Sequence, residues 1–231
     1  MNRKEYPLCA YCNAAPGDTR DHVIARAFFK PPLPVNMRTV RACKACNDAK
    51  AVDERDFRDM VVVDAAAQFN PIAQYLRDEP FLRSASYGSS LVANAIVTGA
   101  CICPYYSKGG VYLGDYPSVS VEGGPVVRTL ERVVRGMFFL WMGVRLPTDL
   151  HVEVCRVPAY NVDKQWAEMT EAGAGGPGGY RNVFEAKFFP GTDNSGHTYW
   201  MIRYYWGVAF TVETYPHGAR RYGDEDAVAA S

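Results

Sequence analysis

Two pairs of closely spaced cysteines constrain the fold of this chain more than any other feature. Cys9 and Cys12 form the first C-x2-C pair, and Cys43 and Cys46 form the second. Four thiolates in two such pairs, about 30 residues apart, are typical of a closed tetrahedral zinc site on which a small, loop-rich segment can fold. The spacing therefore predicts a structural zinc site, in preference to four buried free thiols.

The other cysteines do not extend this pattern. The total of seven in 231 residues is odd, and the clustering favours metal ligands in a reducing compartment over a disulfide framework. Cys101 and Cys103 are separated by one residue in a β-rich stretch, where we expect their thiols to point to opposite faces and to be buried or incidental, in preference to a second metal site with Cys155. No apolar segment follows the basic N-terminus, and the longest mostly apolar stretch, 91–103, is too short to cross a bilayer. We expect cytoplasmic residence and no membrane partner.

Positive charge is concentrated in the first 50 residues, although Lys/Arg and Asp/Glu number 25 each over the whole chain. Segment 1–50 carries nine basic and four acidic residues, a net charge of +5, and the remainder carries −5. A compact basic segment attracts phosphate backbones, and the alternative is an ordinary solvated surface. The residues expected to contact nucleic acid are Arg20, Arg26, Lys44 and Lys50.

Hydrophobic patterning predicts an α+β fold in two parts. In the first part, 1–70, short strands are expected at 19–24 and 38–41, a helix beginning between 44 and 47, and an amphipathic helix over 51–68. The second part, 71–231, is an accessory region of unassigned role. Its expected elements are helical or mixed structure at 72–98, hairpins within 101–122, a helix at 126–143, a strand at 151–157 and aromatic antiparallel strands within 183–212. The strongest strand is expected at 199–206, where core packing is favoured over base stacking.

Three polar residues near the cysteines match the needs of phosphodiester hydrolysis. Asp21 and His22 lie between the two cysteine pairs, and Asn47 follows the second pair directly. A neutral imidazole, with an ordinary pKa of about 6.5, can accept a proton from water at physiological pH. A hard divalent cation such as Mg²⁺ prefers oxygen ligands and keeps several waters, so one carboxylate and one amide are a sufficient protein contribution.

One known family resembles this chain, the HNH endonucleases with the ββα-metal motif, in the series Cys9-x2-Cys12, Asp21-His22-Val23-Ile24, Asn36 and Cys43-x2-Cys46-Asn47-x2-Lys50. The resemblance covers about residues 9–50. It implies that two strands and a helix form the active site, with zinc as a structural clamp. It also implies that His22 is the general base and that Asp21 and Asn47 hold a catalytic Mg²⁺ or Mn²⁺ ion.

Two further roles come from the same resemblance. Asn36 matches the middle Asn of the motif, which braces the loop and helps to orient the base, and Lys50 would face the same phosphate. The chain departs from the family pattern at Ala25, where proline is usual, and at 30–34, where a proline-rich run replaces the common Gly-Gly. The second departure is expected to reshape the loop that faces DNA.

These observations predict a metal-dependent endonuclease that hydrolyses DNA phosphodiester bonds. The alternative is a zinc-stapled nucleic-acid-binding or interaction module without catalysis. RNA stays open beside DNA as the substrate, and the residues indicate neither a target sequence nor an oligomeric state.

Overall fold

The computed structural model describes residues 7–106, 109–176, 178–191 and 196–218. It confirms the α+β class. The helices are α1 (Lys44–Val63), α2 (Pro71–Leu76), α3 (Leu82–Ser86), α4 (Leu91–Gly99), α5 (Gly124–Met142) and α6 (Val162–Glu171). The strands are β1 (Thr19–His22), β2 (Thr39–Ala42), β3 (Cys101–Tyr106), β4 (Tyr112–Ser118), β5 (Leu150–Val157), β6 (Phe184–Pro190), β7 (Thr198–Tyr204) and β8 (Val208–Pro216). Single turns lie at Arg26–Phe28, Ala65–Ala67, Arg77–Phe81 and Ala159–Asn161.

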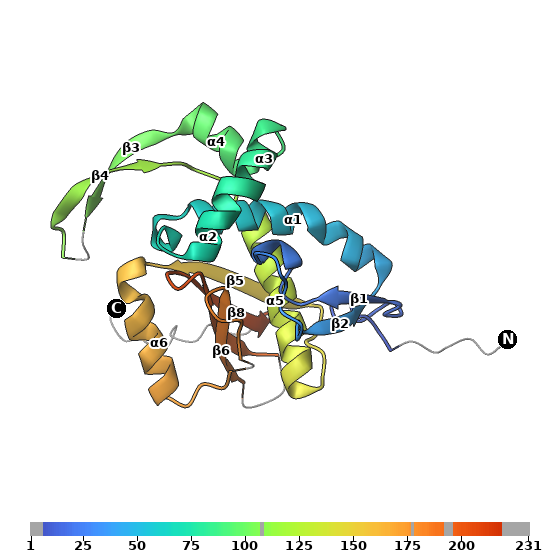
Figure 1. Ribbon diagram of the computed structural model, residues 1–231. Coiled ribbons are helices and arrows are strands. Elements are labelled where there is room, and N and C mark those ends of the chain that lie inside the picture. The colour runs from blue at the N-terminus through green and yellow to red at the C-terminus, as the bar shows by residue number, and fades with distance from the viewer. Residues whose placement is uncertain (1–6, 107–108, 177, 192–195, 219–231) are drawn as a thin grey trace.

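A four-stranded antiparallel sheet in the order β5-β8-β7-β6 forms the base of the molecule (Figure 1). Side chains on successive residues of a strand point to opposite faces, so the two faces of β7 have different neighbours. Trp200 and Ile202 face the main core together with α5, whereas Met201 faces a smaller cluster with Val162 and Met169 of α6. The ring of Trp200 is fully buried, which confirms core packing as the use of this aromatic strand.

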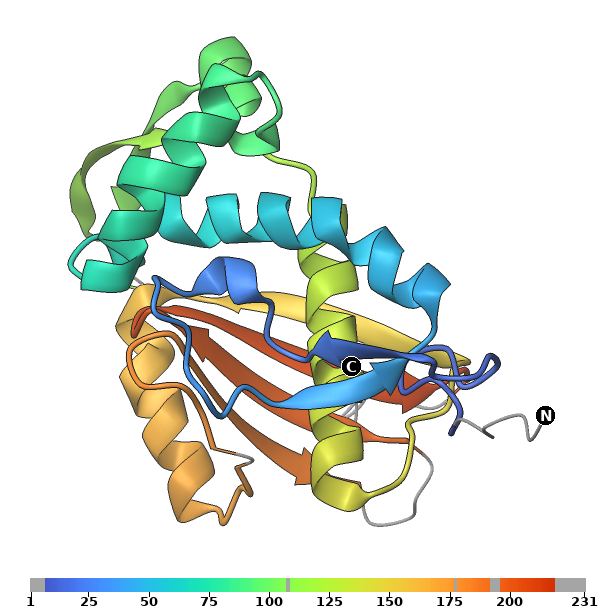
Figure 2. The same ribbon diagram turned by 45° about the vertical axis from the view of Figure 1, so that its right-hand side comes forward.

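The N-terminal elements belong to the same core as this sheet. Figure 2 shows α1 running across α5, with β1 and β2 beside them. The ring of Phe28 lies 5.7 Å from Phe57 of α1 and 5.2 Å from Tyr204 of β7, between ring centroids. The hydroxyl of Tyr205 donates a hydrogen bond of 3.0 Å to the carbonyl oxygen of Phe28. Residues from both sides of position 70 therefore pack together, and a domain boundary there stays a prediction.

Several element boundaries differ from the predicted ones for local reasons. The helix expected to begin between 44 and 47 and the helix expected over 51–68 form one helix that ends at Val63. It ends there because the Asp64 carboxylate accepts a hydrogen bond of 2.8 Å from the N–H of Ala66 and starts a new turn. The strand expected at 199–206 ends at Tyr204. Its next two residues, Tyr205 and Trp206, have positive φ angles of 46° and 73° and turn the chain into β8. Helix α6 was not predicted.

A two-stranded hairpin made of β3 and β4 extends away from the sheet (Figure 1). Its presence confirms the hairpin expected within 101–122. The expectation that its two cysteine thiols point to opposite faces was wrong: the Sγ atoms of Cys101 and Cys103 are 3.3 Å apart. Residues two apart in a strand share a face, so both thiols point the same way. None of the helices within the described residues is long and apolar enough to cross a membrane.

Candidate functional site

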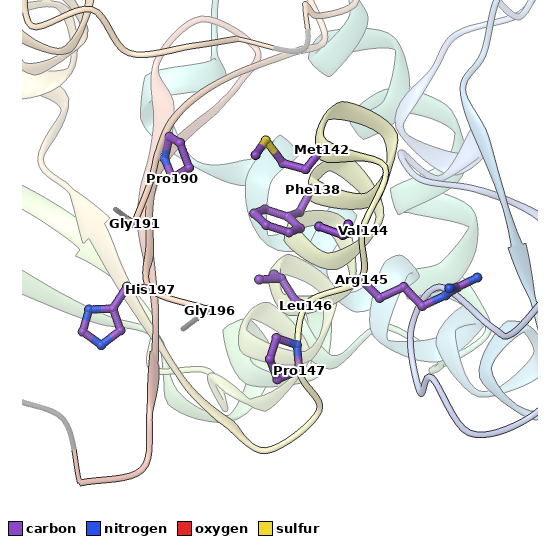
Figure 3. Close-up of a pocket in the computed structure, with 10 residues that line it drawn as sticks. All are labelled: Phe138, Met142, Val144, Arg145, Leu146, Pro147, Pro190, Gly191, Gly196 and His197. Carbon is purple, nitrogen blue, oxygen red and sulfur yellow. The ribbon is translucent and has the colours of Figure 1, made fainter. Parts of the chain in front are cut away.

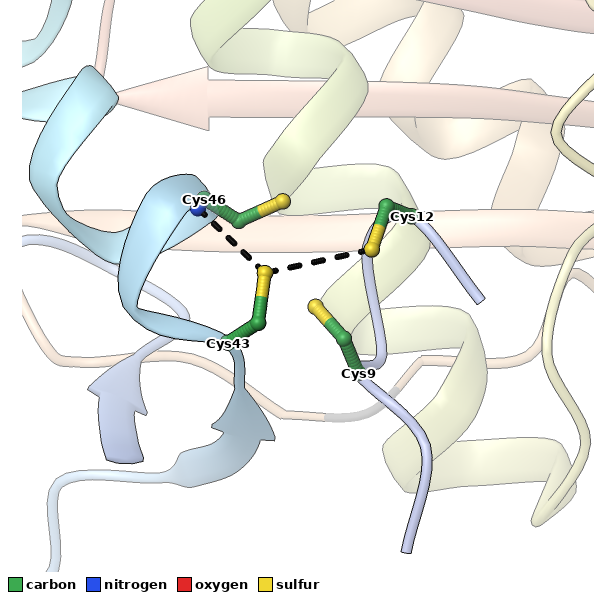
Figure 4. Close-up of side chains that lie close together, drawn as sticks. All are labelled: Cys9, Cys12, Cys43 and Cys46. Carbon is green, nitrogen blue, oxygen red and sulfur yellow. Dashed lines mark hydrogen bonds between the residues drawn. The ribbon is translucent and has the colours of Figure 1, made fainter. Parts of the chain in front are cut away.

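The four cysteines predicted to bind zinc lie together at the N-terminus of α1 (Figure 4). Their Sγ atoms all lie within 4.8 Å of one another, and those of Cys12 and Cys43 are 3.9 Å apart. Tetrahedral zinc bound to sulfur at about 2.3 Å places its ligands roughly 3.8 Å from each other. Cys9, Cys12, Cys43 and Cys46 can therefore hold a zinc ion. Four sulfur ligands leave no open position, which is the donor set of a structural site.

The environment of the thiols suits a cation at their centre. Burial by itself would raise the pKa of the Cys12 thiol. Hydrogen bonds from the backbone of Ala14 and Ala15 and from neighbouring thiols outweigh burial and lower this pKa to about 7. Burial raises the pKa of the Cys46 thiol, and the hydrogen bond with Cys43 and the negative charge of a Cys9 thiolate act in the same direction. Because thiolates repel one another, a metal ion is needed before all four can lose their protons together.

The cysteine cluster connects three segments that would otherwise be separate. The N–H of Ala10 donates to the carbonyl oxygen of Arg41 at 2.9 Å. This hydrogen bond connects residues 9–12, called the first cysteine loop, to β2. Cys43 caps α1, since its sulfur accepts a hydrogen bond of 3.5 Å from the N–H of Cys46. The first cysteine loop, the end of β2 and the start of α1 are thus fixed at one point.

Asp21 lies at the end of β1 with only 3% of its surface exposed. Its Oδ2 accepts a hydrogen bond of 2.8 Å from the Tyr11 hydroxyl, and its Oδ1 forms an ion pair with the ammonium of Lys50. Lys50 also pairs with Glu54 at 3.1 Å, and burial raises the pKa of Glu54. Burial, followed by the charge of Asp21, raises the pKa of Tyr11 and keeps its hydroxyl protonated. Both carboxylate oxygens of Asp21 are therefore engaged.

His22 follows Asp21 and is half-buried. Burial lowers the pKa of its imidazole, and the charges of Arg26 and Lys50 lower it further, while Asp21 acts in the opposite direction. The imidazole is consequently neutral at physiological pH, the form that accepts a proton. Among the residues that the structure describes, this side chain has no hydrogen-bond or ion-pair partner.

Helix α5 fixes the backbone just after His22 by a close approach. A β-carbon on Gly136 would lie 2.8 and 2.9 Å from the two methyl carbons of Val23, so only glycine lets the helix pass this close. The N–H of Val23 donates to the carbonyl oxygen of Arg38 at 3.1 Å and continues the pairing of β1 with β2. The end of β1 is therefore held between β2 and α5.

Asn47 lies in the first turn of α1, where its amide Nδ2 donates to Thr19 Oγ1 at 3.3 Å. Thr19 and Asp21 are two residues apart in β1 and share a face. Asn47 and Lys50 are three apart in α1, so they also share a face. The pairs Thr19–Asn47 and Asp21–Lys50 place the first turns of α1 along β1. The predicted metal ligands thus lie on the two elements that meet there, and within the described residues the amide oxygen of Asn47 has no hydrogen-bond partner.

The remaining predicted residues are less closely integrated. Asn36 is exposed and lines a different pocket, of about 330 Å³, together with Lys30, Tyr180 and Arg181. Within the described residues it forms no hydrogen bond to His22, and its bracing role stays a prediction. Of the residues expected to contact nucleic acid, Arg20, Arg26 and Lys44 are exposed and Lys50 is half-buried, and their contact with nucleic acid also stays a prediction.

Two residues of the site were missed in the sequence. Tyr11 stands inside the first cysteine pair, where nothing in the pattern indicates that its hydroxyl would reach Asp21. Glu54 is four residues after Lys50, and this helical spacing could have suggested the ion pair.

A second pocket, of about 360 Å³, lies between the end of α5 and the strands (Figure 3). Phe138, Met142 and Leu146 give it an apolar lining. The side chains of Arg145 and His197 point out of this space in Figure 3. Within the described residues of its lining, no polar side chain points into this space, so they give the pocket no evident part in the chemistry of the site.

Comparison of the chain with family models, with curated proteins and with solved structures finds no match. The interpretation of the site therefore depends on the geometry and chemistry of its own residues.

Proposed function

We propose that the chain is a metal-dependent endonuclease of the HNH type that hydrolyses DNA phosphodiester bonds, with His22 as the general base and Asp21 and Asn47 as ligands of Mg²⁺ or Mn²⁺. One observation carries the proposal. The Thr19–Asn47 hydrogen bond and the Asp21–Lys50 ion pair hold the first turns of α1 against β1, the strand that carries Asp21 and His22, and this junction is called the corner. The sulfur cluster at the start of α1 supports the same corner.

Each residue has a defined task in this proposal. The neutral imidazole of His22 takes a proton from the attacking water, for which its lowered pKa favours the unprotonated form. The exposed guanidinium of Arg26 attracts the phosphate backbone. A divalent cation, when bound, supplies neutralisation of the phosphoryl charge and of the leaving oxygen.

The residues present fit such a cation. A carboxylate and an amide oxygen are hard donors, which Mg²⁺ prefers. The ammonium of Lys50 forms an ion pair with Asp21 Oδ1, where a positive charge is needed to balance the buried carboxylate. Metal binding would displace this ammonium, and the released Lys50 would then be able to contact the phosphate.

The second candidate function is a zinc-stapled nucleic-acid-binding or interaction module without catalysis. The observation that favours it is the same engagement of Asp21. Tyr11 and Lys50 satisfy both of its oxygens, so the carboxylate is neutralised without any metal ion. In a non-catalytic module, Asp21 would have this structural role alone.

Nicking of supercoiled plasmid in the presence of Mg²⁺ or Mn²⁺ tests the proposal. We expect the wild type to nick and His22→Ala to be slower by a factor of about 100 or more, the usual contribution of a general base. His151→Ala is the matched control, since His151 is exposed and stacks on Tyr215 away from this corner.

Two results would overturn the proposal. Equal nicking by wild type and His22→Ala would remove His22 as the base. Duplex DNA binding that persists in EDTA, with no cleavage of DNA or RNA under any divalent metal, would favour the non-catalytic module.

A further inference from the structure

The hairpin formed by β3 and β4, called the arm below, exposes its side chains on both faces. All of its residues are exposed except Cys103 and Gly114, which are half-buried. Figures 1 and 2 both show it extending from the end of α4, away from the four-stranded sheet. A two-stranded sheet with no covered face is at best marginally stable in water. The arm therefore needs a surface to pack against.

Each face of the arm carries an aromatic pair. The register pairs Tyr106 with Tyr112, and their ring centroids are 5.7 Å apart, on the face that also carries Ile102. The rings of Tyr105 and Tyr116, 5.6 Å apart, lie on the other face. Exposed fractions range from 45% for Tyr105 to 68% for Ile102. Exposed apolar side chains on both faces of one hairpin are unusual on a monomer and mark an interaction site.

The neighbouring helices enlarge this surface. On α3 and α4 and the turn between them, Leu82, Tyr87 and Val97 are 56%, 81% and 85% exposed. With about 100 Å² for each half-exposed aromatic side chain, the arm and these helices present on the order of 1,000 Å² of apolar surface per chain. Covering half of it on each of two chains would bury on the order of 1,000 Å² in total, the lower end for a specific protein interface.

Charge decides which kind of partner suits this surface. Among the described residues of the arm, Asp115 carries the only charged side chain, so these residues offer no positive charge to a phosphate backbone. The whole chain has equal numbers of basic and acidic residues, so two copies do not repel each other through net charge. A two-fold axis brings the same apolar surface from each copy together, which makes the contact self-complementary.

We propose that the arm and the adjoining faces of α3 and α4 form a self-association surface, on which a second copy of this chain packs. The contact uses the side-chain faces and not the strand edges. Pro104 in β3 and Pro117 in β4 have no backbone N–H, which makes lengthening of the sheet at its edges less favourable.

Sedimentation equilibrium of the full chain, at concentrations from 1 to several hundred micromolar on the scale of a transient dimer, tests this proposal. We expect the wild type to form a dimer. The double variant Tyr106→Glu, Tyr112→Glu should weaken association at least tenfold, because charged side chains would be buried in the contact. Tyr105→Glu, Tyr116→Glu tests the opposite face in the same way, and at least one of the two variants must show the loss.

Phe69→Glu is the control, because Phe69 is 78% exposed and lies outside the surface. It should dimerise like the wild type, and all variants should keep the circular dichroism spectrum and zinc content of the wild type. A wild type that stays monomeric over the whole range would overturn the proposal, and so would arm variants that dimerise unchanged. Binding of a monomeric wild type to neutral phosphatidylcholine vesicles would instead identify a lipid surface as the partner and overturn it too.

Discussion

Lys50 of α1 forms an ion pair with Asp21 of β1, and the two side chains are only 12% and 4% exposed. The pair joins the first turns of the helix to the strand that carries His22. Because a buried carboxylate is costly without a positive partner, the ammonium stabilises the fold at the position where the proposed cation would bind. The ammonium of Lys50 and the proposed cation therefore compete for the same Asp21 carboxylate.

Replacement of this ammonium separates the two roles. In Lys50→Met we expect a loss of about 3–5 kcal/mol in the free energy of unfolding without divalent metal, since Asp21 keeps its buried charge unpaired. We also expect at least about tenfold tighter Mg²⁺ binding, because no ammonium has to be displaced. Urea unfolding and titration calorimetry measure the two effects.

Lys164→Met is the control for this prediction, because Lys164 is 74% exposed and pairs with Glu168 at 3.7 Å on a distant helix. It should change neither quantity appreciably. Unchanged or weaker Mg²⁺ binding by Lys50→Met would mean that Asp21 is not a ligand of the cation.

Zinc removal is expected to destabilise the whole fold. The cysteine cluster connects α1 with β2, and these elements share one core with the C-terminal sheet. Metal analysis should find about one zinc per chain, and Cys43→Ser should lose the metal and unfold at a lower temperature, because metal binding and folding are coupled. Cys155→Ser, which changes an exposed thiol outside the cluster, should retain both zinc and stability. A stable, metal-free wild type would contradict this prediction.

Local sequence signals predicted the parts of the site that depend on short-range geometry. The cysteine spacing predicted the sulfur cluster, and the strand and helix signals around it predicted β1, β2 and the start of α1. The contacts of Asp21 were not predictable in the same way. The hydrogen bond from Tyr11 depends on how the first cysteine loop folds back, and the close approach of Gly136 to Val23 joins residues more than 100 positions apart. Such contacts arise from packing, which no local pattern records.

Helix α6 shows a different reason for failure. Its apolar residues Val162, Trp166 and Met169 have the helical spacing of one buried face, but the helix has only 10 residues and no side chain caps its N-terminus. The helix is stabilised by packing on the sheet, through Met201 among others, and not by its own propensity. Recognising it required the sheet to be known first.

Acid should weaken the contact between α1 and α5 through Asp53. Burial by itself would raise the pKa of this carboxyl. The hydrogen bonds and charges of Arg128 and Arg132 outweigh burial, so the pKa lies below its ordinary value. A lowered folded-state pKa adds stability above the unfolded value of about 3.9, and this stability is lost as pH falls through the folded value. Asp53→Asn should cost about 1–3 kcal/mol near neutral pH, and its difference from the wild type should shrink below about pH 4.

Urea unfolding at a series of pH values measures this difference. Asp163→Asn is the control, since Asp163 is 97% exposed although it pairs with Arg203 at 3.2 Å. Its difference from the wild type should stay near zero at every pH. A pH-independent effect of Asp53→Asn would show that the carboxylate contributes through packing and not through its charge.

Gly136→Ala tests the close contact between α5 and the end of β1. The added methyl group would lie 2.8 Å from Val23, which is 4% exposed and stiff because it is β-branched. We expect overpacking to cost about 1–3 kcal/mol, partly offset by a gain of about 1 kcal/mol in helix propensity. Because Val23 follows His22, plasmid nicking should also slow down. Gly99→Ala at the end of α4, where a β-carbon meets nothing within 4 Å, should do neither.

The double variant Gly136→Ala, Val23→Ala distinguishes this contact from a general loss of stability. Removing the two methyl groups of Val23 makes room for the new β-carbon, so the two substitutions should be less harmful together than the sum of their separate effects, by at least about 0.5 kcal/mol in the free energy of unfolding. Additive effects would show that Val23 and Gly136 do not press on each other. In that case the position of His22 would have to be fixed by β2 alone, through the hydrogen bond between Val23 and Arg38.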